Sequence, residues 1–137
     1  ENGKTAGKSM SRAIPDLTGH SVLIAEDDWT NMALIKELLK PTGILINTAV
    51  DGREAVDFIK AGNRPDFVLM DLKMPVLDGF EATVIIHAAN PSIPVIAITA
   101  LAFQDDNQKA LDAGCIDVIM KPIKRDIFYS RIKKIFN

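Results

Sequence analysis

Short apolar runs alternate with longer amphipathic stretches from residue 20 to the end of the chain. The apolar runs have the length of strands and lie at 21–26, 44–49, 66–71, 94–99 and 116–120. The amphipathic stretches have helical spacing and lie at 29–40, 52–61, 79–89, 103–113 and 124–136. Runs that are apolar throughout are typical of strands covered on both faces. The pattern therefore predicts five strand–helix units built around a parallel sheet.

Local signals mark the ends and faces of these helices. Pro41 ends the first helix, Asp51 is a predicted N-cap for the second, and Gly114 follows the fourth. In the first helix the residues predicted to form the buried stripe are Asn31, Leu34, Ile35, Leu38 and Leu39. An outer patch is predicted from Trp29, Met32 and Ala33.

The connections between parallel strands set the expected topology. Because such crossovers are right-handed, the chain should wind both ways from its first strand, in the order 2-1-3-4-5. We therefore predict an α/β fold of the flavodoxin-like (βα)5 type, a doubly wound sandwich with a five-stranded parallel sheet. Ligands of such sheets gather beyond the carboxyl ends of the strands, here between the first and third strands.

Length and composition limit the possible classes of protein. The 137 residues are enough for one domain, predicted over 19–137, after a polar lead-in over 1–18. The net charge of −2, with no basic stripe, argues against nucleic acid as the main partner. No apolar run approaches the roughly 20 residues of a spanning helix, so no membrane contact is expected. One cysteine, Cys115, suits the cytoplasm and is predicted to be a small buried residue.

Polar side chains end four of the predicted strands. Glu26 and Asp27 end the first, Asp71 the third, Thr99 the fourth and Lys121 the fifth. Because the carboxyl ends of parallel strands meet at one edge, we expect these acids, the hydroxyl and the amine to face one site.

The three carboxylates suggest a metal site. They repel one another unless a cation intervenes, and oxygen ligands suit Mg²⁺, or Mn²⁺ in its place. Asp27 and Asp71 are the predicted direct ligands, and Glu26 binds directly or through water. The backbone carbonyl of Lys73 is a further candidate ligand.

Asp71 is also a candidate nucleophile, since a carboxylate can attack phosphorus to give an acyl phosphate. The metal ion and the Lys121 ammonium would neutralise the incoming phosphoryl group. The Thr99 hydroxyl and the backbone N–H groups of Lys73 and Ala100 would hold its oxygens.

Two other classes of function compete. A haloacid-dehalogenase-type phosphatase also uses a strand-end aspartate with Mg²⁺, but it requires two aspartates separated by one residue, which 26–28 (EDD) does not supply in the right context. A flavodoxin-like cofactor binder would need a Ser/Thr/Gly phosphate loop after the first strand, and the sequence has none there.

In four segments the chain resembles a bacterial response-regulator receiver domain. The segments are 22–28 (VLIAEDD), 70–79 (MDLKMPVLDG), 98–100 (ITA) and 121–123 (KPI). The resemblance implies Mg²⁺-dependent phosphorylation of Asp71 by a phosphohistidine. It also implies a shift of Thr99 that alters the surface formed by the fourth helix, fifth strand and fifth helix. The outer patch of Trp29, Met32 and Ala33 would then dock the phosphohistidine-bearing kinase or phosphotransfer domain.

Two positions depart from the usual family pattern and two more bear on phosphate lifetime. Val118 stands where the family often has an aromatic switch residue, and Glu26 stands where Asp is common. Lys73 and Leu101 occupy positions that, as the resemblance implies, tune hydrolysis of the acyl phosphate in this family. Apolar Leu101 is predicted to exclude water and lengthen the phosphate lifetime.

Within the family the chain is most like the C-terminal receiver of a hybrid sensor histidine kinase. The longer protein would then be a histidine kinase, whether or not it is anchored in a membrane, with this domain in the cytoplasm. A stand-alone single-domain response regulator is the alternative. The chain itself is not expected to turn over a substrate, beyond its own phosphorylation and slow dephosphorylation.

Overall fold

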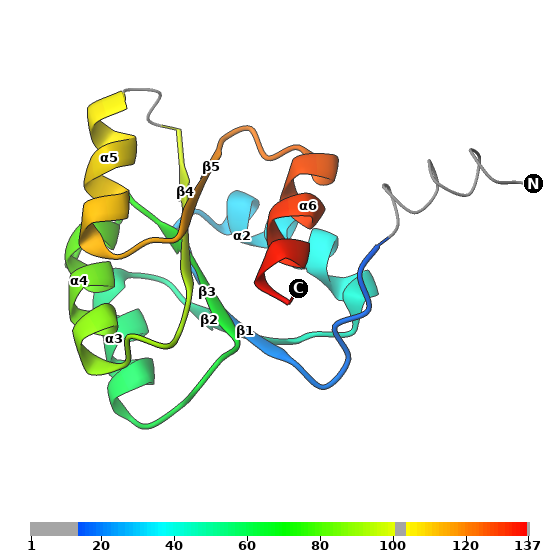
Figure 1. Ribbon diagram of the computed structural model, residues 1–137, viewed down its shortest axis with the longest axis horizontal. Coiled ribbons are helices and arrows are strands. Elements are labelled where there is room, and N and C mark those ends of the chain that lie inside the picture. The colour runs from blue at the N-terminus through cyan, green and yellow to red at the C-terminus, as the bar shows by residue number, and fades with distance from the viewer. Residues whose placement is uncertain (1–13, 101–103, 137) are drawn as a thin grey trace, which may run out of the picture.

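Five parallel strands form the centre of the molecule in a computed structural model that describes residues 14–100 and 104–136 (Figure 1). They are β1 (Ser21–Ala25), β2 (Leu45–Ala49), β3 (Phe67–Asp71), β4 (Val95–Thr99) and β5 (Asp117–Met120). Their order in the sheet is β2-β1-β3-β4-β5. The predicted fold class and strand order are therefore confirmed.

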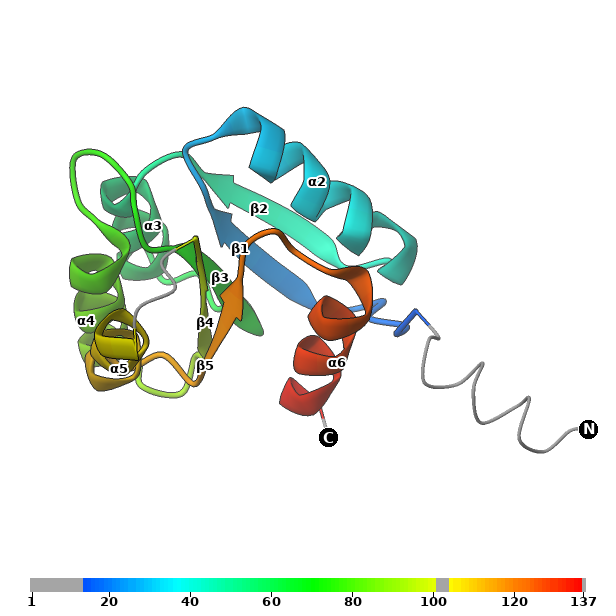
Figure 2. The same ribbon diagram turned by 90° about the horizontal axis from the view of Figure 1, so that it is seen from above.

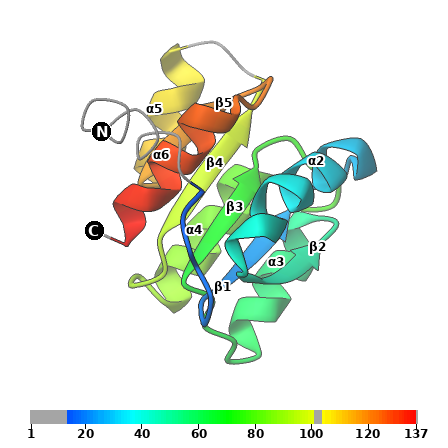
Figure 3. The ribbon, with the colours of Figure 1, turned by 90° about the vertical axis from the view of Figure 1, so that its right-hand side faces the viewer.

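Helices cover both faces of this sheet (Figures 1 and 3). The helices are α2 (Trp29–Leu39), α3 (Gly52–Lys60), α4 (Gly79–Ala89), α5 (Gln104–Ala113) and α6 (Arg125–Ile135), with a short 3-10 turn, η1 (Lys40–Thr42), after α2. Side chains of α2 and α6 pack on one face and those of α3, α4 and α5 on the other. Each of these strands and α-helices lies within one residue of its predicted bounds, whereas η1 was not predicted.

The two central strands explain why the apolar runs are continuous. All five residues of β3 and all five of β4 are buried, because each strand is covered on both faces. Asp71 and Thr99 are the last residues of these strands and the only polar ones in them. A rigid, buried backbone therefore carries both side chains to the rim of the sheet.

Aspartate side chains begin the helices that follow the first three strands. Asp28, Asp51 and Asp78 accept hydrogen bonds from the backbone N–H groups of Thr30 (2.9 Å), Glu54 (2.8 Å) and Glu81 (2.9 Å). Each bond satisfies one of the donors left unpaired in the first turn of a helix. The Asp51 cap was predicted from the sequence.

The buried face of α2 differs from the prediction. Met32, Ile35 and Leu39 are buried, whereas Leu34 is 42% exposed. The buried stripe thus follows i, i+3 and i+7 spacing from Met32, and the apolar Leu34 lies outside it. Because Met32 packs in the core, it does not belong to the predicted outer patch, and that part of the prediction is wrong.

The packed unit extends into the segment predicted as a lead-in. The Leu17 side chain is 4% exposed within the core, and its backbone N–H donates to the carbonyl of Thr42 at 2.7 Å. Among the described residues, no helix is long and apolar enough to cross a membrane.

Candidate functional site

The polar strand ends come together in one pocket at the carboxyl edge of the sheet. Its volume is about 250 Å³, and its lining residues are Glu26, Asp27, Asp28, Asn31, Asp71, Lys73, Thr99, Ala100 and Lys121. These include every residue that the sequence assigned to the metal site, the nucleophile and the phosphoryl-binding groups. The parallel topology brings them together, since each follows or ends a strand of the same sheet.

Glu26 is the most deeply buried acid of the pocket, at 2% exposure. Its Oε2 accepts a hydrogen bond from the backbone N–H of Asp28 at 3.2 Å. Its Oε1 is buried and has no hydrogen-bond partner among the described residues. Burial, followed by the adjacent Asp71 carboxyl, raises the pKa of Glu26 to about 7, and the Asp28 N–H and the Lys121 ammonium oppose that shift.

Asp71 lies at the end of the central strand, with its side chain aimed into the pocket. It is 5% exposed, and its Oδ1 accepts a hydrogen bond from the backbone N–H of Lys73 at 3.2 Å. The following loop turns back closely, because a Cβ on Gly79 would lie 2.2 Å from the Asp71 carbonyl oxygen. Glycine at position 79 therefore lets α4 begin directly beside the candidate nucleophile.

Lys121 is the cation that faces the acids. Its Nζ lies 3.4 Å from Glu26 Oε1 and 3.5 Å from Asp71 Oδ1, and its side chain is 19% exposed. Its backbone N–H donates to the carbonyl of Thr99 at 2.8 Å, and the bond to Pro122 is cis. One ammonium group thus serves two carboxylates in a site that is largely shielded from water.

The acids can hold a divalent cation. Glu26, Asp27 and Asp71 each offer a carboxylate oxygen, and these oxygens lie within 4.8 Å of one another. Glu26 Oε1 is buried without a hydrogen bond and has only the Lys121 ammonium at 3.4 Å as a partner, so it can also bind an ion. A donor set of hard oxygens beside a pocket of this size fits Mg²⁺ or Mn²⁺.

Two pocket residues were not assigned a site role from the sequence. Asp28 caps α2, and it also lines the pocket and donates its backbone N–H to Glu26 Oε2. Asn31 was placed on the buried face of α2, but it lines the pocket and donates from Nδ2 to Asp28 Oδ2 at 3.1 Å. Their position within one turn of Asp27 is the signal that could have identified them.

The remaining predicted positions lie outside this pocket. Trp29 is 80% exposed and Ala33 is exposed, so both are available at the surface beside the acids. Val118 is partly buried against the core under α4 and α5. Leu101 falls outside the described residues.

The fold and this pocket together define a class of protein: a doubly wound domain whose acids, hydroxyl and lysine meet at the ends of a parallel sheet. Comparison with known families identifies the class. The model of the response regulator receiver domain matches residues 22–133. The chain therefore belongs to the response regulator receiver family of two-component signalling, as the resemblance predicted.

Relatives with curated names include hybrid kinases and a small response regulator. The chain is 39% identical to hybrid signal transduction histidine kinase I of Dictyostelium discoideum, over 96% of this chain and 8% of that protein. It is 36% identical to the polar-differentiation response regulator DivK of Brucella anthropi, over 82% of this chain and 93% of that protein. The chain thus spans under a tenth of the kinase and most of the small regulator.

Solved structures share the fold at similar identity. The receiver domain of a Pseudomonas aeruginosa sensor histidine kinase, solved with a magnesium ion coordinated in its active-site cleft, is 35% identical. It aligns with a TM-score of 0.79 over 88% of this chain and all of that one. A Francisella response regulator receiver domain, 31% identical over 86% of this chain and 97% of that one, also gives a TM-score of 0.79.

Proposed function

We propose that this domain accepts a phosphoryl group from a phosphohistidine onto Asp71. A carboxylate oxygen of Asp71 attacks the phosphorus atom, the bond from phosphorus to the imidazole nitrogen breaks, and the imidazole leaves with that electron pair. The product is an aspartyl phosphate. The observation that carries the proposal is the Asp71 carboxylate, held at the end of a buried strand with the Lys121 ammonium 3.5 Å away.

The other pocket residues suit the charge that arrives with the phosphoryl group. Lys121 offsets negative charge in a partly buried site, where electrostatic stabilisation is stronger than in water. Thr99 is the proposed donor of a hydroxyl hydrogen bond to one phosphoryl oxygen. The backbone N–H groups of Lys73 and Ala100 are proposed to bind others, and both residues line the pocket.

Mg²⁺, or Mn²⁺, is the proposed cofactor. Glu26, Asp27 and Asp71 would hold the ion through carboxylate oxygens, and the Lys73 carbonyl is proposed as a further ligand. When bound, the ion offsets the mutual repulsion of the acids and part of the phosphoryl charge. The longer Glu26 side chain reaches the cluster, since one of its oxygens lies within the shared 4.8 Å limit.

The proposed consequence of phosphorylation is a change of the surface formed by α5, β5 and α6. Thr99 ends β4 and pairs with Met120 of β5, so a shift of Thr99 toward a phosphoryl oxygen would change the packing on that side of the sheet. With Val118 in the position that is often aromatic, this response would not use an aromatic switch residue. Trp29 and Ala33 are the proposed contacts for the phosphohistidine-bearing domain, because both are exposed on α2 next to the acids.

Two settings for this domain are proposed. The identity to hybrid kinases over nearly the whole chain favours a receiver within a hybrid histidine kinase, on the cytoplasmic side of any membrane. The similarity to DivK over most of its length supports a stand-alone regulator as the second setting. Bacterial origin stays a prediction, since the two hybrid-kinase relatives belong to Dictyostelium discoideum.

Incubation with a phosphohistidine donor tests the proposal. In the presence of Mg²⁺, the intact mass should rise by one phosphoryl group, and a chelator should prevent the rise. Asp71→Asn should show no gain, while Asp51→Asn, at a partly buried helix cap that does not line the pocket, should gain as the native chain does. Sustained release of phosphate from a simple phosphate ester would instead favour the aspartyl-nucleophile phosphatase.

A further inference from the structure

The two edges of the sheet differ in a way that the phosphoacceptor site does not explain. β2 and β5 are the outermost strands, and every other strand is paired on both sides. An unpaired edge offers a row of backbone donors and acceptors to any other strand, so folded proteins usually cover or blunt it. The hydrogen-bond partners of the outward backbone groups at each edge therefore show which edge can pair with another strand.

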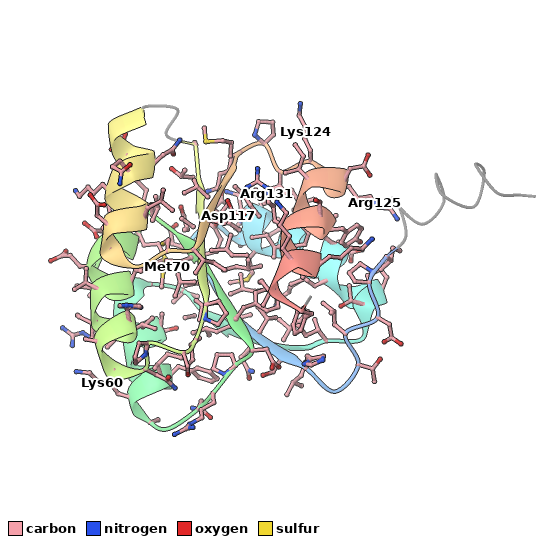
Figure 4. The ribbon with its side chains drawn as sticks, viewed as in Figure 1. Lys60, Met70, Asp117, Lys124, Arg125 and Arg131 are labelled. Carbon is pink, nitrogen blue, oxygen red and sulfur yellow. The ribbon has the colours of Figure 1, made fainter. Side chains whose placement is uncertain are left out.

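At β5 the chain's own side chains occupy the outward backbone groups of Val118. The N–H of Val118 donates to Asp117 Oδ1 at 2.8 Å, and the carbonyl of Val118 accepts from Arg131 Nη1 at 3.0 Å. Arg131 also forms an ion pair with Asp117 at 2.7 Å. Figure 4 shows Asp117 and Arg131 close together between β5 and α6. Both backbone groups at the middle of this strand are therefore already paired.

At β2 the outward groups are open. The Leu45 N–H donates to His20 on the β1 side, and the Ala49 carbonyl accepts from Glu26 there. Backbone groups alternate in direction along a strand, so those of Ile46 and Thr48 point away from β1. No other described strand lies on that side, and Figure 2 shows β2 at the margin of the sheet beside α2.

Side chains around this edge also suit an interface. Leu45 is 65% exposed, and a groove of about 330 Å³ lies between the edge and α2. The groove is lined by Ala33, Lys36, Glu37, Lys40 and Ile46, so apolar groups and charges of both signs share one rim. β2 itself contains no proline and no charged residue that would discourage pairing.

We propose that β2 pairs with β2 of a second copy of this chain, joining two sheets across a two-fold axis. Antiparallel pairing centred on Asn47 places Ile46 of each copy opposite Thr48 of the other. Each such pair then exchanges both of its N–H to carbonyl bonds. The same axis makes the two α2 helices antiparallel. Glu37 of one copy would then face Lys36 and Lys40 of the other. This surface combines an unpaired strand edge, apolar side chains, and positive and negative charges. It is therefore complementary to a second copy of itself, and we propose that copy as its partner.

The β2–β2 pairing, called the seam below, is short, so the dimer should be weak and dependent on concentration. Sedimentation of the native chain from about 10 µM to about 1 mM should show a rise toward dimer. Leu45→Lys and Thr48→Pro should abolish that rise, since one charges the seam and the other removes an outward N–H. Thr48→Ser and Ile116→Lys are the matched controls, and both should dimerise. Ile116 is 55% exposed beside the covered edge.

A crosslink tests the register itself. Residues opposite one another on the axis have Cα atoms about 4.5 Å apart, within the roughly 4.4–6.8 Å that a disulfide spans. With Cys115→Ala as background, Asn47→Cys should therefore form an intermolecular disulfide at least 10-fold faster than Leu45→Cys, which lies far from its own copy in this register. Circular dichroism confirms that each variant is folded.

Two results would overturn the proposal. One is a native chain that stays monomeric through the whole concentration range. The other is a dimer that survives both Leu45→Lys and Thr48→Pro but is lost in Ile116→Lys. Neither result bears on phosphorylation of Asp71, which can be measured on the same variants.

Discussion

At the residue scale, two buried acids of the pocket, Glu26 and Asp71, destabilise the free protein, and a bound cation would reduce their repulsion. Glu26 is almost fully buried beside Asp71, and its Oε1 has no hydrogen-bond partner among the described residues. Lys121 lies within 3.5 Å of both acids, and its charge offsets only part of the free energy that their burial costs. Acids that bind a ligand are often held in such an environment, at the expense of the free protein's stability.

Removal of the buried charge should therefore stabilise the metal-free protein. Above pH 7, where Glu26 is mostly ionised, we expect Glu26→Gln to raise the free energy of unfolding in chelator by about 1–2 kcal/mol, because an amide of the same shape carries no charge. Addition of Mg²⁺ should stabilise the native chain and have a smaller effect on Glu26→Gln. Urea unfolding with and without Mg²⁺ measures both effects. A variant less stable than the native chain in chelator would contradict this account.

Val76, in the loop after β3, has a strained backbone. It has a φ of 68°, a value that β-branched residues rarely adopt, and it is 78% exposed. Leu77 N–H donates to the Pro75 carbonyl at 2.7 Å and closes the tight turn around it. We expect Val76→Gly to raise the free energy of unfolding by about 0.5–1 kcal/mol.

The matched control for this substitution is Val50→Gly. Val50 is also exposed, at 53%, but it is not among the described residues with positive φ. Glycine there relieves no strain and adds entropy to the unfolded chain, so stability should fall. Equal effects of the two substitutions, measured by urea unfolding, would argue against strain at Val76.

At the element scale, the sequence was sufficient for the strands and for most of the helices. Buried strands leave long apolar runs, and Asp71 and Thr99 could be assigned to strand ends because they terminate such runs. The face of α2 was harder, since Leu34 is as apolar as its buried neighbours and only the position of the sheet separates them. Composition cannot reveal which side of a helix meets a sheet when several stripes are apolar.

The loops were the least predictable part of the site. The positive φ of Val76 contradicts the usual preference of a β-branched residue, so no local signal announces it. The strand order predicted that Lys121 faces the acids, but its nearly equal distances to Glu26 and Asp71 depend on the spacing of strands that are far apart in sequence. Such features follow from tertiary packing and not from the residues nearby.

The loop after β3 is held by α3 through a glycine. A Cβ on Gly52 would lie 2.0 Å from the backbone oxygen of Leu77, which cannot move as a side chain can. Gly52→Ala should therefore lower the free energy of unfolding by about 1–3 kcal/mol and displace the loop that carries Lys73.

Gly62→Ala gives the comparison for that effect. Gly62 has a φ of 100° and open space around it, so its substitution costs only the conformational term, about 1 kcal/mol. If Gly52→Ala proves no more destabilising than Gly62→Ala in urea unfolding, the close contact does not hold the loop.

At the scale of the whole molecule, a buried thiol links pH to global unfolding. Cys115 lies in the core, where burial raises its pKa to about 11, from 9.0 for an exposed thiol. The folded state holds this proton up to a higher pH than the unfolded state does. The protein therefore keeps its full free energy of unfolding below pH 9 and loses part of it as the pH rises toward 11. The full loss is about 2–3 kcal/mol.

Comparison with Cys115→Ala isolates this contribution. The native chain should lose stability more steeply than the variant between pH 9 and pH 11, although the variant starts lower because it leaves a small cavity. Parallel curves for the two proteins would show that Cys115 does not titrate with unfolding.

The central claim is that the residues gathered at the carboxyl edge of this sheet make Asp71 the phosphoacceptor. The direct measurement is to locate the phosphoryl group after reaction with a phosphohistidine donor and Mg²⁺. Borohydride reduces an aspartyl phosphate to homoserine, which mass spectrometry of peptides can place. We expect homoserine at position 71 alone. Homoserine at another acid, or a stable phosphate on a hydroxyl or histidine, would contradict the account.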